Sequence, residues 1–177
     1  MIDLNTKILL KINGLVGKSK LLDSFGRAGA EWLIVAIGAW YIASDLVENM
    51  PDRRRVFLPL IFLAAAWTVG WLINLLIGMS VREQRPYITN PQIKPLFHSL
   101  VSWKTFPSDH SMSAFLMFFM ANIFHLPGAW ALLPMALWVV WGRVYAGMHY
   151  PLDILGGISV AVFVATSAYL ILSLLKF

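Results

Sequence analysis

Three short polar stretches interrupt an otherwise apolar chain, and together they hold side chains suited to acid–base and anion-binding chemistry. They are REQRPY at 82–87, FPSDHS at 106–111 and GRVYAGMHYPLD at 142–153. Taken alone, each has an ordinary explanation. An arginine can be a snorkelling anchor, Ser108 or Asp109 can cap a helix, and His149 with Asp153 can be an i,i+4 helical pair. Their joint occurrence needs a further explanation.

The residue types favour a phosphate ligand over a metal ion. Two histidines and nearby carboxylates could bind a metal, but Arg85 and Arg143 beside them would repel a divalent cation. Paired arginines next to a helix N-terminus suit a phosphate instead. A phosphate site of this kind takes its charge stabilisation from arginine and also needs a nucleophile and a proton donor. We therefore expect neither a metal nor another cofactor.

The two histidines differ in their neighbours, which suggests different roles. Asp153 follows His149 by one helical turn, so it can accept the Nδ1 proton and leave Nε2 free to attack phosphorus. His110 has no such neighbour except Asp109, at the start of an expected helix. We expect His149 to be the nucleophile, Asp153 to orient it, and His110 to act as general acid and base.

Composition indicates a membrane protein. The 177 residues suit one domain, 59% of them are apolar, the mean hydropathy is +0.70, and only 13% are charged. Soluble proteins average about 25% charged residues, so an unusually apolar soluble helical protein is disfavoured. The net charge of +5 suits topology control and anionic lipid heads. No basic stretch is interleaved with aromatic residues, which argues against nucleic acid as a partner. The absence of cysteine excludes disulfides and thiolate nucleophiles.

Hydropathy predicts an all-α fold, a polytopic bundle of five to six membrane helices in one domain, 1–177. Within an N-terminal segment, 1–27, the pattern over 2–16 is typical of an amphipathic interfacial helix. A charged turn is expected at 48–55 and a polar interval at 80–109. Five apolar stretches are expected to cross the membrane: 29–47, 56–79, 111–126, 128–147 and 152–175.

Counting crossings brings the polar stretches together. The interval 80–109 joins the second and third crossings, and the fourth crossing returns to the same face. The stretch 142–153 should therefore lie beside the other two, where ionisable groups at membrane depth are candidates for function. Arg53, Arg54 and Arg55 fall on the opposite face, which the positive-inside rule assigns to the cytoplasm. The many cations expected on the shared face count against that orientation.

These stretches resemble the signature of the type 2 phosphatidic acid phosphatase superfamily, in which Lys-x6-Arg-Pro, Pro-Ser-Gly-His and Ser-Arg-x5-His-x3-Asp occur in this order. The resemblance covers about residues 56–175. The matching residues are Arg85, Pro86, Pro107, Ser108, His110, Arg143, His149 and Asp153. Three positions depart from the pattern: Gly78 stands in place of lysine, Asp109 in place of glycine, and Gly142 in place of serine. Arg82 is a candidate to replace the missing lysine.

Within the superfamily the chain looks most like the bacitracin-resistance-type undecaprenyl pyrophosphate phosphatases, which are small and carry PSDH. That resemblance implies a bacterial plasma-membrane enzyme with an extracytoplasmic site and no metal. It implies attack by His149, a phosphohistidine, and hydrolysis through His110. The implied phosphate ligands are Arg85, Ser108, Arg143 and the Asp109 backbone, with Arg82, Lys94 and Lys104 as further candidates, the two lysines for a second phosphate.

Three alternatives stay open at this stage. The same chemistry could act on phosphatidylglycerophosphate, phosphatidate or lipid A 1-phosphate. A phosphohistidine could also pass its phosphate to another lipid. A lipid-binding or transport protein without catalysis would explain the apolar spans and the basic face, but it would not explain the two histidines with their polar neighbours. The sequence does not determine the oligomeric state.

Overall fold

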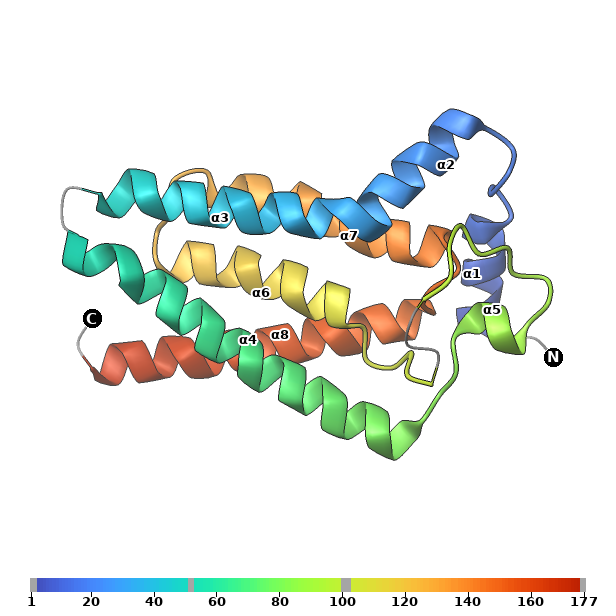
Figure 1. Ribbon diagram of the computed structural model, residues 1–177. Coiled ribbons are helices and arrows are strands. Elements are labelled where there is room, and N and C mark those ends of the chain that lie inside the picture. Colours follow the sequence, from blue (N-terminus) through green and yellow to red (C-terminus); the bar gives the residue numbers. More distant parts are fainter. Residues whose placement is uncertain (1–2, 51–52, 100–102, 176–177) are drawn as a thin grey trace.

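The computed structural model describes residues 3–50, 53–99 and 103–175, and within them all regular structure is helical (Figure 1). The charged turn expected at 48–55 includes residues 51–52, which lie outside the described residues, as do the side chains of Arg53, Arg54 and Arg55. The chain forms six principal helices in the described residues, so the predicted all-α bundle is confirmed. They are α1 (Leu4–Asn13), the joined α2, η1 and α3 (Lys20–Arg27, Ala28–Trp32, Leu33–Asn49), α4 (Arg53–Val81), α6 (Asp109–Ile123), η2 with α7 (Ala129–Ala131, Leu132–Tyr145) and α8 (Pro151–Leu174). A single turn, α5 (Pro86–Thr89), follows α4.

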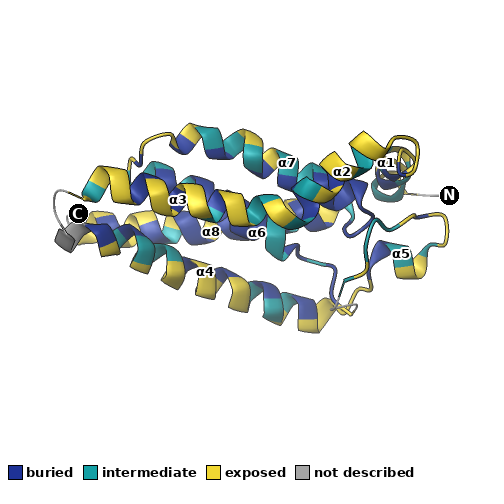
Figure 2. Cartoon of the chain, turned by 45° about the horizontal axis from the view of Figure 1, so that its top comes forward, coloured by how far each residue is buried: buried dark blue, intermediate teal, exposed yellow. Residues whose placement is uncertain are grey.

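Helix α6 is the centre of the bundle, and α3, α4, α7 and α8 pack around it (Figure 1). Ten of its fifteen residues are buried, among them Met112, Leu116 and Met120 with no exposed surface. The surrounding helices instead expose large apolar side chains. Figure 2 shows these exposed residues in yellow along the outer faces of the helices. An apolar outer surface on this scale suits a lipid environment.

Three helices of the described chain are long and apolar enough to cross a membrane, which makes this a multi-pass membrane protein. They run over Lys20–Asn49, Val56–Thr89 and Pro151–Leu174. The crossings expected at 111–126 and 128–147 correspond to shorter helices, α6 and η2 with α7. A helix rises about 1.5 Å per residue, so these two are short of a hydrocarbon core of roughly 30 Å. Five full crossings therefore stay a prediction.

The N-terminal segment differs from the expectation of one amphipathic stretch over 1–27. Helix α1 ends at Asn13, and Gly17 follows with a left-handed backbone (φ 83°). Helix α2 then begins after Ser19, whose side chain accepts a hydrogen bond from the Leu22 amide, 3.4 Å away. Because the π-helical turn η1 joins α2 to α3, the first long helix begins at Lys20, nine residues before the predicted crossing at 29.

A close approach of α7 to this joined helix explains Gly142. A Cβ atom at position 142 would lie 2.6 Å from the Ala30 nitrogen and 2.9 Å from the Gly26 carbonyl oxygen. These atoms are backbone, so they cannot rotate away. The serine of the family pattern therefore does not fit at this position without moving η1.

We predict that Gly142→Ser destabilises the protein by roughly 1–3 kcal/mol, because overpacking a close backbone contact costs about that much. The thermal unfolding midpoint of the purified protein in detergent measures the effect. Gly38→Ser is the matched control, since a Cβ atom there meets only the Met117 sulfur at 3.9 Å. Equal midpoints for the two variants would contradict the packing argument.

Candidate active site

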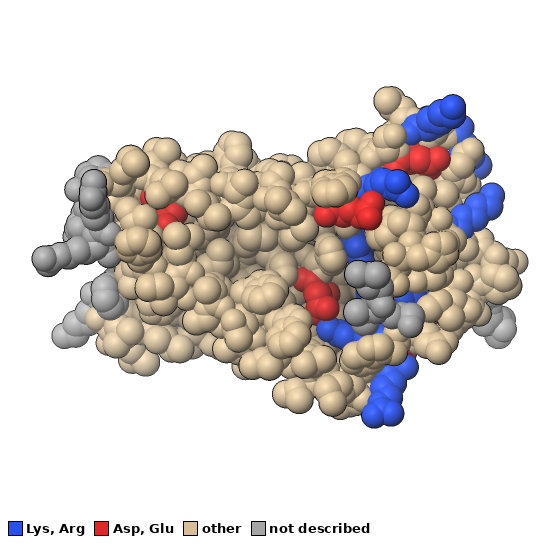
Figure 3. Space-filling model, viewed as in Figure 1, with Lys and Arg blue, Asp and Glu red and all other residues tan. Residues whose placement is uncertain are grey.

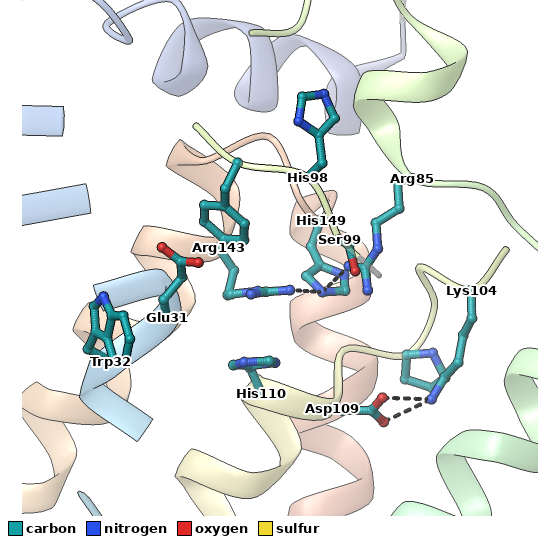
Figure 4. A pocket seen from close by; sticks show the side chains of 12 residues that line it. Glu31, Trp32, Arg85, His98, Ser99, Lys104, Asp109, His110, Arg143 and His149 are labelled. Atoms are coloured by element: carbon teal, nitrogen blue, oxygen red, sulfur yellow. Dashed lines mark hydrogen bonds and ion pairs between the residues drawn. The ribbon is translucent and has the colours of Figure 1, made fainter. Parts of the chain in front are cut away.

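The three polar stretches meet in one cavity of about 480 Å³ at the end of the bundle where α6 and α8 begin. The predicted residues Arg85, Asp109, His110, Arg143 and His149 all line it (Figure 4). The rest of its wall is formed by Glu31, Trp32, Phe97, His98, Ser99, Lys104 and Pro107. Most charged side chains on the face shown in Figure 3 lie at this end. The convergence inferred from counting crossings is thus observed.

Local sequence folds the stretch 142–153 into a sharp connection between α7 and α8. Gly147 has a left-handed backbone (φ 72°), as the residue after a helix C-cap often does. The Gly147 amide donates a hydrogen bond to the Val144 carbonyl, and the Met148 amide donates one to the Arg143 carbonyl, both at 3.0 Å. These two hydrogen bonds form a Schellman motif. Pro151 then starts α8, and Asp153 accepts a hydrogen bond from the Tyr150 amide at 2.8 Å. His149 is held between these two helix ends.

His149 is almost completely buried, and its Nε2 atom faces two guanidinium groups. The Nη1 atom of Arg85 lies 2.8 Å from Nε2, and the Nη2 atom of Arg143 lies 3.3 Å from it (Figure 4). Arginine can only donate hydrogen bonds, so Nε2 must be the unprotonated, accepting nitrogen. This arrangement suits a nucleophile whose lone pair points at the place where two cations can also hold an anion.

The opposite ring nitrogen contacts both the predicted Asp153 and a residue that the sequence did not indicate, Thr105. Asp153 Oδ2 is 3.4 Å from His149 Nδ1. The Thr105 hydroxyl lies 3.3 Å from the same nitrogen and donates to Asp153 Oδ2 at 2.7 Å. Because a hydroxyl can accept and donate at once, Thr105 can link the Nδ1 proton to the carboxylate. A threonine two residues before the Pro107-Ser108 pair has no distinguishing pattern in the sequence.

Burial lowers the pKa of His149 well below the usual 6.5, and the positive charges of Arg143 and Arg85 lower it further. His149 lies in the connection between α7 and α8, outside both helices. Its neutral form, which is the form that can attack phosphorus, therefore persists at pH values where a free imidazole is already charged.

The start of α6 supplies His110 and Asp109 to the cavity and uses Ser108 as a cap. The Ser108 hydroxyl accepts from the Ser111 amide at 3.4 Å and from the Ser111 hydroxyl at 2.9 Å. Ser108 is fully buried and does not line the cavity, so its observed contacts are those of the helix cap that the sequence also suggested. His110 lies in the cavity on the α6 side (Figure 4).

The three further candidate cations differ in position. Lys104 lines the cavity, and its Nζ atom lies 2.8 and 2.9 Å from the two carboxylate oxygens of Asp109. The exposed Lys94 does not line the cavity. Arg82, also exposed, donates through Nε to the Met79 carbonyl of its own helix end. The structure therefore brings Lys104 to the cavity and leaves the other two outside it.

The cavity wall includes a loop that α1 holds in place. The buried Asn13 side chain accepts from the Lys94 amide at 2.8 Å and donates to the Lys94 and Tyr145 carbonyls at 2.9 Å each. A few residues further on, the Phe97 ring lies 5.8 Å from the Arg143 guanidinium carbon. Asn13 was not singled out from the sequence. The one indication in the sequence was that this polar residue follows Leu9 by four positions, which places it on the apolar face of α1.

Fold and cavity together define a class: a multi-pass helical membrane protein with a buried histidine, two arginines and a second histidine at one end of its bundle. The PAP2 superfamily model matches residues 58–176, and the chain belongs to this superfamily. It is therefore a membrane lipid phosphatase by family.

Two relatives and one solved structure are similar to this chain. Undecaprenyl-diphosphatase BcrC of Bacillus subtilis strain 168 is 28% identical over 161 residues, which cover 91% of this chain and 80% of the relative. The bacitracin transport permease protein BcrC of Bacillus licheniformis is 26% identical over 155 residues, 88% of this chain and 74% of the relative. The crystal structure of Aquifex aeolicus LpxE superposes with a TM-score of 0.68 at 22% identity, covering 99% of this chain and 97% of that one, and supports the fold.

We predict that Thr105→Val lowers kcat for phosphate release about ten- to a hundredfold. Losing a buried hydrogen bond to a charged group costs roughly 1.5–3 kcal/mol, and about 1.4 kcal/mol is one factor of ten in rate. Thr105→Ser keeps the hydroxyl and should restore most of the activity. A fully active valine variant would show that the link through Thr105 is not used.

We also predict that the His149 ring is neutral at pH 6. Spectra of the ¹⁵N-histidine-labelled protein in detergent measure this, with His149→Gln to assign the resonances. Arg85→Met should raise the pKa of His149, because it removes one of the charges that lower it. A His149 ring that is at least half protonated at pH 6 in the wild-type protein would contradict the prediction.

Proposed function

We propose that this protein removes the terminal phosphate of a polyprenyl pyrophosphate, undecaprenyl pyrophosphate above all, through a phosphohistidine and without a metal. The single observation that carries the proposal is the position of His149 Nε2 between Arg85 and Arg143, at 2.8 and 3.3 Å. The pyrophosphate substrate is suggested by the Bacillus subtilis relative that is named an undecaprenyl-diphosphatase.

In the first step, the terminal phosphate takes the two guanidinium groups as its ligands. Those groups now point at Nε2, so their transfer to phosphate oxygens also frees the nitrogen lone pair. A bond forms between Nε2 and the terminal phosphorus, and the bond to the bridging oxygen breaks with its electron pair going to that oxygen. The lipid monophosphate leaves, and the carboxylate of Asp153 stabilises the positive ring through Thr105.

In the second step, His110 acts as a base and takes a proton from a water molecule that attacks the phosphohistidine. The phosphorus–nitrogen bond breaks, inorganic phosphate leaves, and His149 returns to its neutral form. The same two arginines hold the phosphoryl oxygens in both steps, which supplies the charge stabilisation that a metal gives in other phosphatases.

The proposed site faces outward from a bacterial plasma membrane. Helix α4 begins at Arg53, at the end of the bundle opposite the cavity (Figure 1). The three consecutive arginines there suit the cytoplasmic side, since positive loops are retained inside. A polyprenyl carrier would then bring its pyrophosphate to the outer leaflet.

We predict that His149→Ala lowers phosphate release at least about a thousandfold, because removing a nucleophile removes the covalent path. Release is measured in EDTA over undecaprenyl pyrophosphate, phosphatidylglycerophosphate, phosphatidate and lipid A 1-phosphate, with the pyrophosphate expected to give the highest kcat/KM. His125→Asn is the matched control. That histidine lies next to a separate cavity, and asparagine tolerates its left-handed backbone (φ 52°). Activity of His149→Ala, dependence on a metal, or a preference for another lipid would each contradict one part of the proposal.

A further inference from the structure

Lys104 reaches the cavity along a path that Gly78 leaves open. A Cβ atom at position 78 would lie 2.7 Å from the Cγ and Cδ atoms of Lys104, so the lysine stem occupies the space of a side chain on α4. This is the position at which the superfamily pattern has its own lysine. The cation is thus present in this protein, but it comes from the loop before α6 instead of from α4.

The charge of Lys104 is held by a carboxylate that is itself open to the cavity. The Lys104 side chain is 7% exposed and the Asp109 side chain is 42% exposed. Asn74, which is completely buried, donates to Asp109 Oδ1 at 2.9 Å and fixes the carboxylate from the α4 side. A buried ammonium needs a counterion, whereas a half-exposed carboxylate can be solvated without one. Lys104 can therefore leave Asp109 for another anion at modest cost.

The Lys104–Asp109 pair lies in the same cavity as His149 and its two arginines. Asp109 precedes His110 in the first turn of α6, and both line the cavity together with Lys104 (Figure 4). In the same view Lys104 contacts Asp109, whereas Arg85 and Arg143 contact His149 Nε2. A substrate whose terminal phosphate takes the two arginines therefore meets a third cation, Lys104, in the same cavity.

We propose that Lys104 selects a pyrophosphate over a monophosphate by exchanging Asp109 for the departing lipid phosphate. This inference rests on the proposed function. When Nε2 bonds to the terminal phosphorus, the bridging oxygen keeps the electron pair and stays on the lipid phosphate, whose new negative charge Lys104 neutralises. The second ionisation of a phosphate monoester lies near pH 6, so this group can leave without a proton. A monophosphate instead releases an alcohol, which needs the proton of His110 and gives Lys104 nothing to bind.

The test compares farnesyl pyrophosphate with farnesyl phosphate, which share one lipid chain. Lys104→Met alone would leave the Asp109 charge in the cavity and repel both substrates. The informative variant is therefore Lys104→Met/Asp109→Asn, which removes both charges and keeps the net charge of the site. We expect its kcat/KM to fall at least about tenfold for the pyrophosphate and less than about threefold for the monophosphate. Equal losses for both substrates would overturn the proposal.

Two single variants separate the lysine from its partner. Asp109→Asn retains Lys104 and should keep the ratio of the two kcat/KM values within about threefold of the wild-type ratio. A loss of preference as large as that of the double variant would assign selectivity to Asp109 and overturn the role of Lys104. Lys18→Met, which removes an exposed lysine between α1 and α2, is the control for loss of a cation.

A binding measurement keeps this test independent of catalysis. Inorganic pyrophosphate and inorganic phosphate are titrated by calorimetry into the full-length protein and the double variant, both in detergent, with matched thermal unfolding midpoints as the folding check. The double variant should lose about tenfold in affinity for pyrophosphate and little for phosphate. Unchanged pyrophosphate affinity overturns the inference. A wild-type protein that binds pyrophosphate through Lys104 but releases phosphate from no lipid overturns the proposed function alone.

Discussion

The burial of two arginines beside His149 is the constraint on which the rest of the site depends. Buried cations are costly unless they are paired or solvated by polar groups. Here Arg85 donates to the Met148 carbonyl at 3.1 Å and Arg143 to the Ala30 carbonyl at 3.1 Å, and both meet His149 Nε2. Three separate parts of the chain therefore have to arrive at one place: η1, the start of α5, and the end of α7 with its connection to α8. An anionic ligand is the group that would best complete such an arrangement.

The departures from the superfamily pattern are structurally linked to their surroundings. Gly142 is required because η1 lies against α7 at the turn whose Ala30 carbonyl accepts from Arg143. Gly78 provides room for Lys104, and Asp109 provides the counterion of that lysine. Gly142 and Gly78 are matched by contacts from distant segments, and Asp109 also accepts a hydrogen bond from Asn74 of α4. The site differs from the family pattern in how its charges are delivered, while the two histidines, two arginines and Asp153 keep their order and spacing.

Much of the fold and part of the site could be predicted from sequence because the relevant forces act locally. Apolar stretches of sufficient length predicted the long helices, and Ser108 was a candidate cap for the helix that it caps in the structure. Counting the expected membrane crossings was enough to predict that the three polar stretches lie together. The start of the first long helix was placed nine residues late, because the polar residues of α2 hide a helix that continues through the π-turn η1. Hydropathy cannot detect such a continuation.

The sequence by itself determined the residue types and their spacing within each stretch: the Schellman turn, the Tyr150–Asp153 cap, and the histidine held between them. These features depend on hydrogen bonds between residues at most five positions apart. Only the tertiary structure decided that Thr105 bridges His149 and Asp153, that Asn13 fixes the loop beside the cavity, and that Lys104, and not Arg82 or Lys94, enters it. Those outcomes depend on contacts between residues that are far apart in the sequence. The separations run from 26 positions, for Lys104 and Gly78, to 132 positions, for Asn13 and Tyr145. The contacts of Thr105 with His149 and Asp153, and of Asn13 with Lys94, lie between these limits. Contacts at such separations are set by how whole helices pack, and no local pattern encodes them.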